Sequence, residues 1–294
     1  MKIQQVTIIG TGLIGGSLAL ALKKRGCAGR VVGCDRHEVL ARAKKAKAID
    51  AGIPDPGKAV AGSAIVVLAT PVGQILDLME RIAPRLDPRA LLTDVGSTKV
   101  EILARARSVF GAEASKRFLG GHPIAGKEEA GFEHADAGLF QGAPWIFTPL
   151  AGQKVAGGWS GELLKLVKRV GAKPVVLDAE HHDRLCAWAS HLPQLLSTAL
   201  AAALEEEFGG DAEIQAVSGR GLRDMTRLAA SPYAMWRDIA FTNSTNIEAA
   251  LSKLEQRLAH VRENLRTAEL REEFEQANEF RHRDTEAQRK AKLK

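Results

Sequence analysis

The sequence predicts an α/β fold in which a doubly wound parallel sheet is followed by an all-helical domain. Short apolar runs rich in Val, Ile and Leu alternate with helical stretches up to residue 178, as in parallel sheets covered by helices. Beyond residue 178 the strand pattern stops and only helical periodicity continues. At 294 residues the chain is long enough for two domains. We therefore expect residues 1–178 to form the first domain and residues 179–294 the second.

The composition is that of an ordinary globular protein, with 45% hydrophobic and 26% charged residues. The three cysteines form no C-x-x-C pair and their odd number gives no disulfide framework, which favours a reducing cytoplasm. The first predicted strand begins within six residues of Met1, and no apolar run approaches the roughly 20 residues of a membrane span. The expectation is a cytoplasmic protein with no targeting or membrane segment.

The net charge of +6 does not point to nucleic acid, because most of it lies in one terminal stretch. Residues 281–294 hold six Lys or Arg against Asp284 and Glu286, and no aromatic residue interleaves with them. A solvated helix end explains this stretch better than a nucleic-acid site.

The first apolar run, residues 6–9, leads directly into a glycine cluster and then into a helical pattern. Gly10, Gly12 and Gly15, with Leu13 and Ile14 between the last two, match G-x-G-x-x-G. In this motif the glycines allow a tight turn, a close approach of the backbone to a pyrophosphate and close packing of helix on strand. The helix that follows points its free N–H groups at the phosphates. A purely structural turn is the alternative.

A second predicted strand, residues 30–35, ends in an acidic residue that strengthens the dinucleotide interpretation. Asp35 lies 20 residues beyond Gly15, about where a ribose 2′-hydroxyl is accepted. Since a carboxylate repels a 2′-phosphate, NAD is favoured over NADP, although Arg36 directly after it would soften that preference. The sequence thus predicts a Rossmann-type domain.

Three more strand ends are candidates for the same ligand crevice, because the carboxyl ends of parallel strands line it. The run at residues 64–69 ends at Thr70 and Pro71, which we expect beside the cofactor; the alternative is a proline that merely starts the next helix. The run at residues 90–95 leads to Ser97, whose alternative role is the N-cap of a helix at residues 100–109. The run at residues 118–121 presents His122 beside a proline, which makes this imidazole a candidate base.

The remaining chain is predicted to be helical, with stretches at residues 182–208 and 222–230 and a last helix after Asn246. In that last helix the apolar residues recur in steps of four and three, which is the seam of a coiled coil. Such a seam must be buried against other helices, and a homodimer intertwined through the C-terminal helices is the preferred interpretation. The seam residues are Ile247, Leu251, Leu254, Leu258, Val261 and Leu265.

Taken together, five segments resemble the prephenate and arogenate dehydrogenase family, which carries out the oxidative step of tyrosine biosynthesis. They are IGTGLIGGS (9–17), DVGSTK (94–99), GHPIAG (121–126), SHLP (190–193) and GLRDMTR (221–227), in the family's order. The resemblance implies an NAD-binding Rossmann domain, an all-helical dimerisation domain and a small-molecule substrate.

The family's reaction removes hydride from C4 of a cyclohexadienol and releases the ring carboxylate as CO₂. This chemistry needs a base and a second hydrogen bond at the C4 hydroxyl, and a cation for a carboxylate. His122 fits the base, Ser97 the second hydrogen bond and Arg227 the cation. For Arg227 the alternative is a surface arginine paired with Asp224.

The resemblance also places Glu128, His191, Asp224 and Trp236 in the lining of the substrate pocket or its ionic gate, although core packing is an equal alternative for Trp236. The residue after the SHLP segment is histidine in some family members and Gln194 here. A neutral amide hydrogen-bonds the side chain of the substrate but cannot become cationic, which leaves the choice between prephenate and arogenate open.

Two other classes of protein fit the same plan. One is a β-hydroxyacid dehydrogenase, which relies on a lysine of its helical domain; residues 182–246 contain no lysine. The other is a non-catalytic NAD-sensing dimer, which would have no use for Ser97, His122 and Arg227 together.

Overall fold

A computed structural model of the chain describes residues 3–126 and 129–292. It forms two compact units, Met1–Asn246 and Ile247–Lys294. Among the described residues, no helix is both long and apolar enough to cross a membrane.

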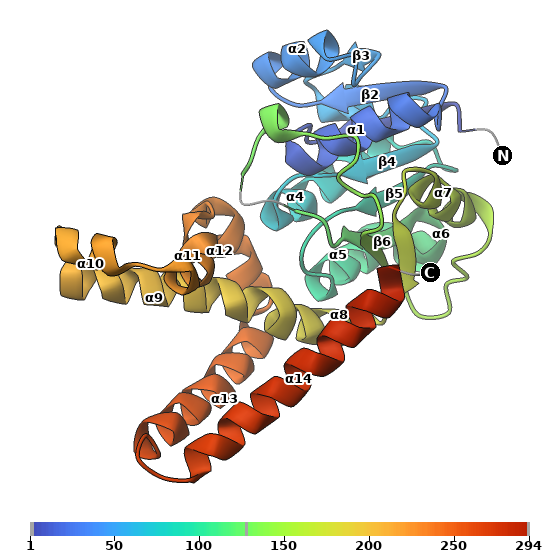
Figure 1. Ribbon diagram of the computed structural model, residues 1–294. Helices are drawn as coiled ribbons and strands as arrows, with labels where there is room; N and C mark the ends of the chain where they lie inside the picture. Colours follow the sequence, from blue (N-terminus) through green and yellow to red (C-terminus); the bar gives the residue numbers. More distant parts are fainter. Residues whose placement is uncertain (1–2, 127–128, 293–294) are drawn as a thin grey trace. The chain divides into compact units, whose positions relative to one another are not determined.

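The first unit contains an eight-stranded sheet in the order β3-β2-β1-β4-β5-β6-β7-β8 (Figure 1). Strands β1 to β6 run parallel, as predicted, whereas β7 is antiparallel to β6 and β8 is parallel to β7. The strands are β1 Gln5–Ile9, β2 Arg30–Cys34, β3 Ala51–Gly52, β4 Ile65–Leu68, β5 Leu91–Asp94, β6 Phe118–Pro123, β7 Pro144–Thr148 and β8 Lys173–Val176.

Helices cover both faces of this sheet because successive residues of each buried strand point to opposite sides. Ile8 packs into one apolar cluster with residues of three helices, α1 (Leu13–Arg25), α2 (His37–Lys45) and α7 (Gly158–Arg169). Its neighbour Ile9 packs into a second cluster on the other face. That face is covered by α3 (Pro56–Ala59), α4 (Val72–Ile82), α5 (Val100–Phe110) and α6 (Ala114–Arg117). The doubly wound α/β prediction is confirmed.

The order of the strands fixes where a ligand binds. Strand β1 lies between β2 and β4. The strand order therefore runs to one side of β1 through β2 and β3, and to the other side through β4, β5 and β6. A crevice opens at such a switch point, outside the carboxyl ends of the strands. The glycine loop, Asp35, Thr70, Ser97 and His122 follow or end β1, β2, β4, β5 and β6, and therefore share this edge of the sheet.

One predicted helix is shorter than its Ala- and Lys-rich sequence suggests. The Ala- and Lys-rich sequence of residues 39–51 predicts a helix throughout, but α2 ends at Lys45. Lys47 has a positive φ of 56°, which no α-helix contains. The Asp50 carboxylate then accepts hydrogen bonds from Val31 N at 2.8 Å and Lys23 Nζ at 2.6 Å, which ties the segment to the sheet and leads into β3. The prediction is wrong beyond Lys45 because these tertiary contacts outweigh helix propensity.

The rest of the chain is helical, as expected. The first unit continues with α8 (Ala179–Cys186), a π-helical turn (Ala187–His191), α9 (Leu192–Phe208), α10 (Ala212–Val217), α11 (Arg220–Thr226), a 3₁₀ turn (Arg227–Ala230) and α12 (Tyr233–Thr242). Helix α13 (Ser244–Glu263) begins at the end of this unit, and α14 (Glu269–Lys292) follows it. The predicted seam is shortened by one member, since Leu265 lies in the turn after α13.

Candidate active site

The glycine loop meets the requirements of a dinucleotide site at all three of its glycines. Gly10 has φ of 92°, and a Cβ there would overlap the carbonyl of Ala69; a Cβ on Gly15 would overlap the carbonyl of Gly10. These two glycines are therefore required by the packing of the chain itself. A Cβ on Gly12, by contrast, would meet nothing within 4 Å. The backbone at Gly12 is therefore open to a close approach, as the pyrophosphate contact of the motif requires.

Asp35 is held next to this loop by the loop's own backbone. Its Oδ2 accepts hydrogen bonds from Thr11 N at 2.7 Å and Thr11 Oγ1 at 3.2 Å, and its Oδ1 accepts one from Arg36 N at 2.8 Å. These donors orient the carboxylate, and Oδ1, which accepts only one of them, keeps a lone pair for a ribose hydroxyl. The residues present therefore fit an NAD cofactor.

Thr70 adds a polar group to the same edge. Its Oγ1 is buried and has no hydrogen-bond partner among the described residues, while its Cγ2 would be the next neighbour of a side chain at Gly10. A buried hydroxyl of this kind fits a bound polar ligand. Pro71 is the N-cap residue of α4, so its helix-starting role is confirmed. Leu13 and Ile14 form the first turn of α1.

Ser97 does not cap the helix that follows it. Helix α5 begins at Val100, and its N-cap is Lys99. The exposed N–H groups of that end are instead satisfied from another helix: Asp183 of α8 accepts from Lys99 N at 2.8 Å and from Val100 N at 2.9 Å. The alternative N-cap role of Ser97 is wrong. Ser97 is partly buried, and its hydroxyl does not cap α5.

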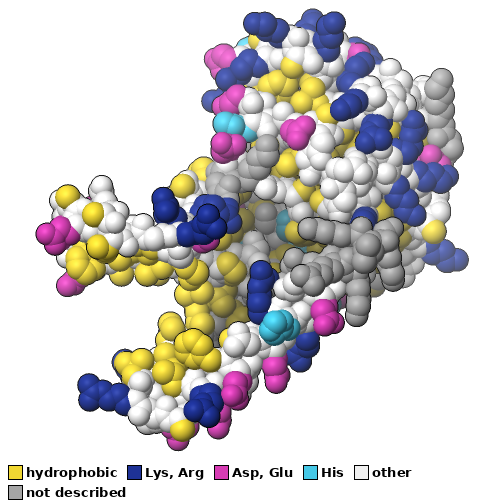
Figure 2. All heavy atoms as spheres, in the orientation of Figure 1, with side chains coloured by type: hydrophobic (Ala, Val, Ile, Leu, Met, Phe, Trp, Pro, Cys, Tyr) yellow, Lys and Arg dark blue, Asp and Glu magenta, His cyan; other side chains and the backbone are white. Residues whose placement is uncertain are grey.

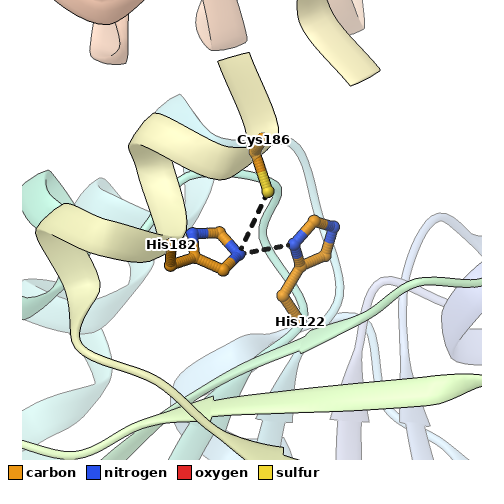
Figure 3. Close-up of side chains that lie close together, drawn as sticks. All are labelled: His122, His182 and Cys186. Atoms are coloured by element: carbon orange, nitrogen blue, oxygen red, sulfur yellow. Dashed lines mark hydrogen bonds between the residues drawn. The ribbon is translucent and has the colours of Figure 1, made fainter. Parts of the chain in front are cut away.

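His122 belongs to a relay of side chains that the sequence did not predict. Its Nδ1 lies 2.9 Å from Nε2 of His182 (Figure 3). On the other side of that ring, Nδ1 of His182 lies 2.7 Å from Oδ1 of Asp183. Because a carboxylate only accepts, the His182 tautomer that donates from Nδ1 accepts at Nε2. His122 then donates from Nδ1, and its Nε2 has no hydrogen-bond partner among the described residues. The relay fixes the tautomer that a base requires.

The surroundings of His122 also keep it neutral. Burial lowers the pKa of His122 well below its ordinary value of 6.5, and the nearby His182, Lys99 and His191 lower this pKa further. The side chain nevertheless keeps some access to solvent. His122 is thus an unprotonated imidazole at neutral pH, with its free nitrogen available to a ligand.

A buried ion pair holds the end of β6 where His122 lies. Lys99 and Asp94 form a salt bridge and both side chains are fully buried. Lys99 Nζ also donates to Gly121 O at 2.8 Å, and Asp94 Oδ1 accepts from Gly121 N at 3.1 Å. Both backbone groups of the residue before His122 are therefore fixed from the β5 side.

His191 and Trp236, both expected in the substrate pocket, are neighbours. Their rings meet edge to face with centroids 6.0 Å apart. Asn243 Nδ2 lies 3.1 Å from His191 Nδ1 and donates at 2.8 Å to the backbone carbonyl of Asp183. Burial lowers the pKa of His191 to about 4. Trp236 Nε1 is buried without a partner among the described residues, so its N–H is available to a bound ligand.

Helix α12 is attached directly to the strand edge that forms the cofactor crevice. Asp238 Oδ2 accepts a hydrogen bond from Gly73 N at 2.9 Å, in the first turn of α4. Close by, Thr98 Oγ1 and Thr242 Oγ1 lie 2.8 Å apart. Trp236 is thereby placed on an element that is bound to the edge carrying Thr70.

The other predicted pocket residues lie around the 3₁₀ turn after α11. Gln194 is buried, and its amide Nε2 donates to Leu228 O at 2.8 Å and to Thr198 Oγ1 at 3.2 Å. Arg227, one residue before Leu228, and Asp224 are exposed. Glu128 lies outside the described residues.

The sequence missed five residues that organise this site: Asp94, Lys99, His182, Asp183 and Asn243. Weak signals existed for Asp94 and Lys99, which open and close the DVGSTK segment, and for His182 and Asp183, which lie in a His-His-Asp run just after residue 178. Nothing in the spacing of residues 122 and 182 indicates that two imidazoles meet.

Comparison with known proteins gives consistent results across the chain. Residues 18–176 match the family described as "Prephenate dehydrogenase, nucleotide-binding domain", and residues 178–279 match "Prephenate dehydrogenase, dimerization domain". Prephenate dehydrogenase of Lactococcus lactis subsp. cremoris is 34% identical over 261 residues, which are 88% of this chain and 70% of the relative.

Two solved structures are similar over nearly their whole length. Prephenate dehydrogenase from A. aeolicus, in complex with hydroxyphenyl propionate and NAD+, is 30% identical, with a TM-score of 0.82 and 98% of each chain covered. Synechocystis arogenate dehydrogenase is 29% identical, with a TM-score of 0.78, covering 95% of this chain and 99% of that one.

Proposed function

This chain belongs to the prephenate and arogenate dehydrogenase family, and from that premise we propose how its residues carry out an NAD-dependent oxidative decarboxylation. The chain is an oxidoreductase of tyrosine biosynthesis, acting on prephenate to give 4-hydroxyphenylpyruvate or on arogenate to give tyrosine. The observation that carries the proposal is Nε2 of His122, which has no partner among the described residues and is held by the His182–Asp183 relay at the edge of the sheet that carries the glycine loop.

NAD, when bound, accepts the hydride from C4 of the substrate. The glycine loop would hold its pyrophosphate, since Gly12 leaves the backbone open to a close approach. Asp35 would accept hydrogen bonds from the ribose hydroxyls. Its negative charge disfavours a 2′-phosphate, which supports NAD over NADP.

His122 would accept the proton of the C4 hydroxyl as the hydride leaves. Its neutral Nε2 is the group required, and a base of this kind contributes about 10²–10⁴ in rate. Ser97, not engaged as a helix cap, would supply the second hydrogen bond at that hydroxyl. Loss of the ring carboxylate as CO₂ then gives the aromatic phenol.

Arg227 would bind a substrate carboxylate through two parallel hydrogen bonds. The 3₁₀ turn that begins with Arg227 is anchored by the bond from Gln194 to Leu228 O. His191 and Trp236 would form part of the pocket wall, and Asp224 its polar rim.

Gln194 supports arogenate as the better substrate. Both of its amide hydrogens are bound within the protein, so only the carbonyl Oε1 is available to a ligand. A carbonyl accepts a hydrogen bond from the ammonium group of arogenate, whereas the keto oxygen of prephenate offers no hydrogen in return. We therefore expect the higher kcat/KM with arogenate.

We also propose a domain boundary near residue 178 and a homodimer formed through the C-terminal helices. The two family matches meet at residues 176 and 178, and the second is to a dimerization domain. Large apolar side chains are exposed on these helices, and Figure 2 shows hydrophobic side chains gathered over α9 and over α13. The large exposed apolar residues beyond residue 178 include Val217, Met225, Tyr233, Phe241, Leu258, Phe274 and Phe280 on helices and Leu265 in the turn after α13.

The deciding experiment is an assay of both substrates with both cofactors, following NADH or NADPH and CO₂. The expected result is turnover with NAD, faster with arogenate, and loss of turnover in His122→Asn while NAD binding is retained. A chain that binds NAD but turns over neither substrate would be the non-catalytic sensor. Normal turnover in His122→Asn would remove the base assignment.

Arg227→Ala provides a separate test of the substrate site. Because a charge-assisted bond to a carboxylate contributes about 1.5–3 kcal/mol, KM should rise roughly 10- to 100-fold. The Kd for NAD should stay unchanged, since Arg227 is assigned no contact with the cofactor. Steady-state kinetics and NAD titration measure the two quantities, and an unchanged KM would exclude Arg227 from the site.

A further inference from the structure

One thiol next to the catalytic relay has no part in the reaction. Cys186 Sγ lies 3.4 Å from His182 Nε2, the same nitrogen that faces His122 Nδ1 (Figure 3). His182 and Cys186 are four residues apart on α8, so they share one face of that helix, while His122 comes from the end of β6. The three ligand atoms lie within 4.8 Å of one another.

We propose that His122, His182 and Cys186 form an inhibitory site for Zn²⁺, or for a divalent ion of similar preference. Thiolate and imidazole are the ligands that Zn²⁺ prefers. In a tetrahedral zinc site, bonds of about 2.0–2.3 Å place ligand atoms about 3.3–3.6 Å apart. Two of the observed separations, 2.9 and 3.4 Å, are close to these values, and the third pair, His122 and Cys186, lies within 4.8 Å, so a small side-chain movement would complete the site. Three protein ligands leave the fourth position open to solvent.

The surroundings are those of a zinc ligand set. Histidines that bind metal donate their other ring N–H to a carboxylate, which orients the ring. His182 makes this contact with Asp183 at 2.7 Å, and Asp183 is fixed in turn by two backbone N–H groups of α5. His182 and Cys186 are buried, whereas His122 is partly exposed and gives the ion a way in.

The inhibition follows from the position of one proton and rests on the proposed function. Coordination releases the thiol proton of Cys186 to solvent and replaces the hydrogen bond between the two histidines. His122 then binds the ion through Nδ1, so its remaining proton moves to Nε2. That nitrogen can no longer accept the proton of the substrate hydroxyl. The metal-bound form therefore holds NAD but has no base.

Co²⁺ binding to chelator-treated protein tests the site without any assay of activity. We expect one equivalent to produce a thiolate-to-cobalt charge-transfer band that Zn²⁺ abolishes by displacement. Cys186→Ala should lose the band, whereas Cys27→Ala, which removes another buried thiol packed in the apolar core, should keep it. No thiolate band, or an equal band in Cys186→Ala, would overturn the site.

Turnover tests the inhibition. Zn²⁺ should abolish NADH formation, EDTA should restore it, and Cys186→Ala should need at least about tenfold more Zn²⁺ for the same fractional loss. Full activity of the cobalt-loaded protein would overturn the inhibitory role. If metal-free protein turns over neither substrate, the proposed function fails, and the cobalt titration still decides the site.

Discussion

The protonation of His122 decides at which pH this site can work. Burial and the adjacent His182, Lys99 and His191 all disfavour the imidazolium, so the pKa of His122 lies below 6.5. The base is active when neutral. Activity is therefore retained as pH falls through 6.5 and is lost only at lower pH, where His122 takes up a proton.

This gives a prediction for the pH profile of kcat/KM, which reports groups of the free enzyme. We expect a plateau from pH 8 to below 6.5, with the acid limb at still lower pH. The measurement is the pH profile of kcat/KM of the wild-type protein with each substrate. Each profile is compared with the ionisation of that substrate, so that an acid limb due to the substrate is recognised. An acid limb centred at or above 6.5 would show that His122 is not shifted or is not the base.

His182 acts through His122 and is a positioning residue. Its replacement by glutamine removes the fixed link to Asp183, so the ring of His122 loses its defined tautomer and orientation. Since misplacement by about 1 Å costs roughly 10²-fold, kcat should fall by that order in His182→Gln. The Kd for NAD should not change. His181→Ala, at an exposed neighbour, is the control and should keep kcat.

A purely structural role for His182 would give a different result. In that case melting temperature would fall and the pH profile of the remaining activity would keep its shape. Loss of the relay instead moves the acid limb of the pH profile to higher pH, because His182 is one of the groups that lower the pKa of His122.

The residues that were predictable and those that were not differ in one physical respect. Gly10, Gly12, Gly15 and Asp35 act within one strand-turn-helix unit, so their spacing along the chain carries the information. The contact of His122 with His182 joins residues 60 apart, and Asp183 caps a helix 83 residues earlier. Such contacts depend on how α8 packs on α5, which no local pattern records.

At the scale of elements, the connection between β5 and α5 links the other parts of the site to one another. It carries Ser97, its Lys99 holds β6 in place through Gly121, and its helix end is capped from α8. Removing one partner of a buried pair leaves an uncompensated charge, which costs about 3–5 kcal/mol. Lys99→Met should therefore lower the free energy of unfolding by about that amount.

Urea unfolding measures this effect, with Lys116→Met as the matched control. Lys116 pairs with Glu113 on the surface, with side-chain exposures of 72% and 57%, so its loss should cost less than about 1 kcal/mol. Equal effects of the two substitutions would mean that the buried pair contributes no more than a surface one.

The elements themselves were predictable where apolar periodicity was strong. Strands β1, β4 and β5 are continuous buried runs and were located correctly, as was the helical character beyond residue 178. The end of α2 and the two-residue β3 were not predicted, because they depend on hydrogen bonds of Asp50 to β2 and α1. The π-helical turn at Ala187–His191 was also unexpected, and it carries His191 of the site.

At the scale of the whole molecule, the exposed apolar residues of the C-terminal helices are the surface on which the proposed homodimer depends. Leu258, a member of the predicted seam on α13, is 56% exposed in the single chain. Leucines at this spacing are buried when helices of two subunits pack together. A carboxylate at such a position would lose its hydration without gaining a hydrogen-bond or ion-pair partner, which destabilises the assembly.

We therefore expect Leu258→Asp to convert a dimer into a monomer. Light scattering coupled to size exclusion measures the mass, and the change should be largest at low protein concentration, where mass action favours dissociation. Val176→Asp is the matched control, because Val176 is similarly exposed, at 51%, but lies on β8 of the sheet. It should leave the mass of the dimer unchanged. A wild-type chain that is monomeric at all concentrations, or a Leu258→Asp variant that is still a dimer, would show that this seam does not join two subunits.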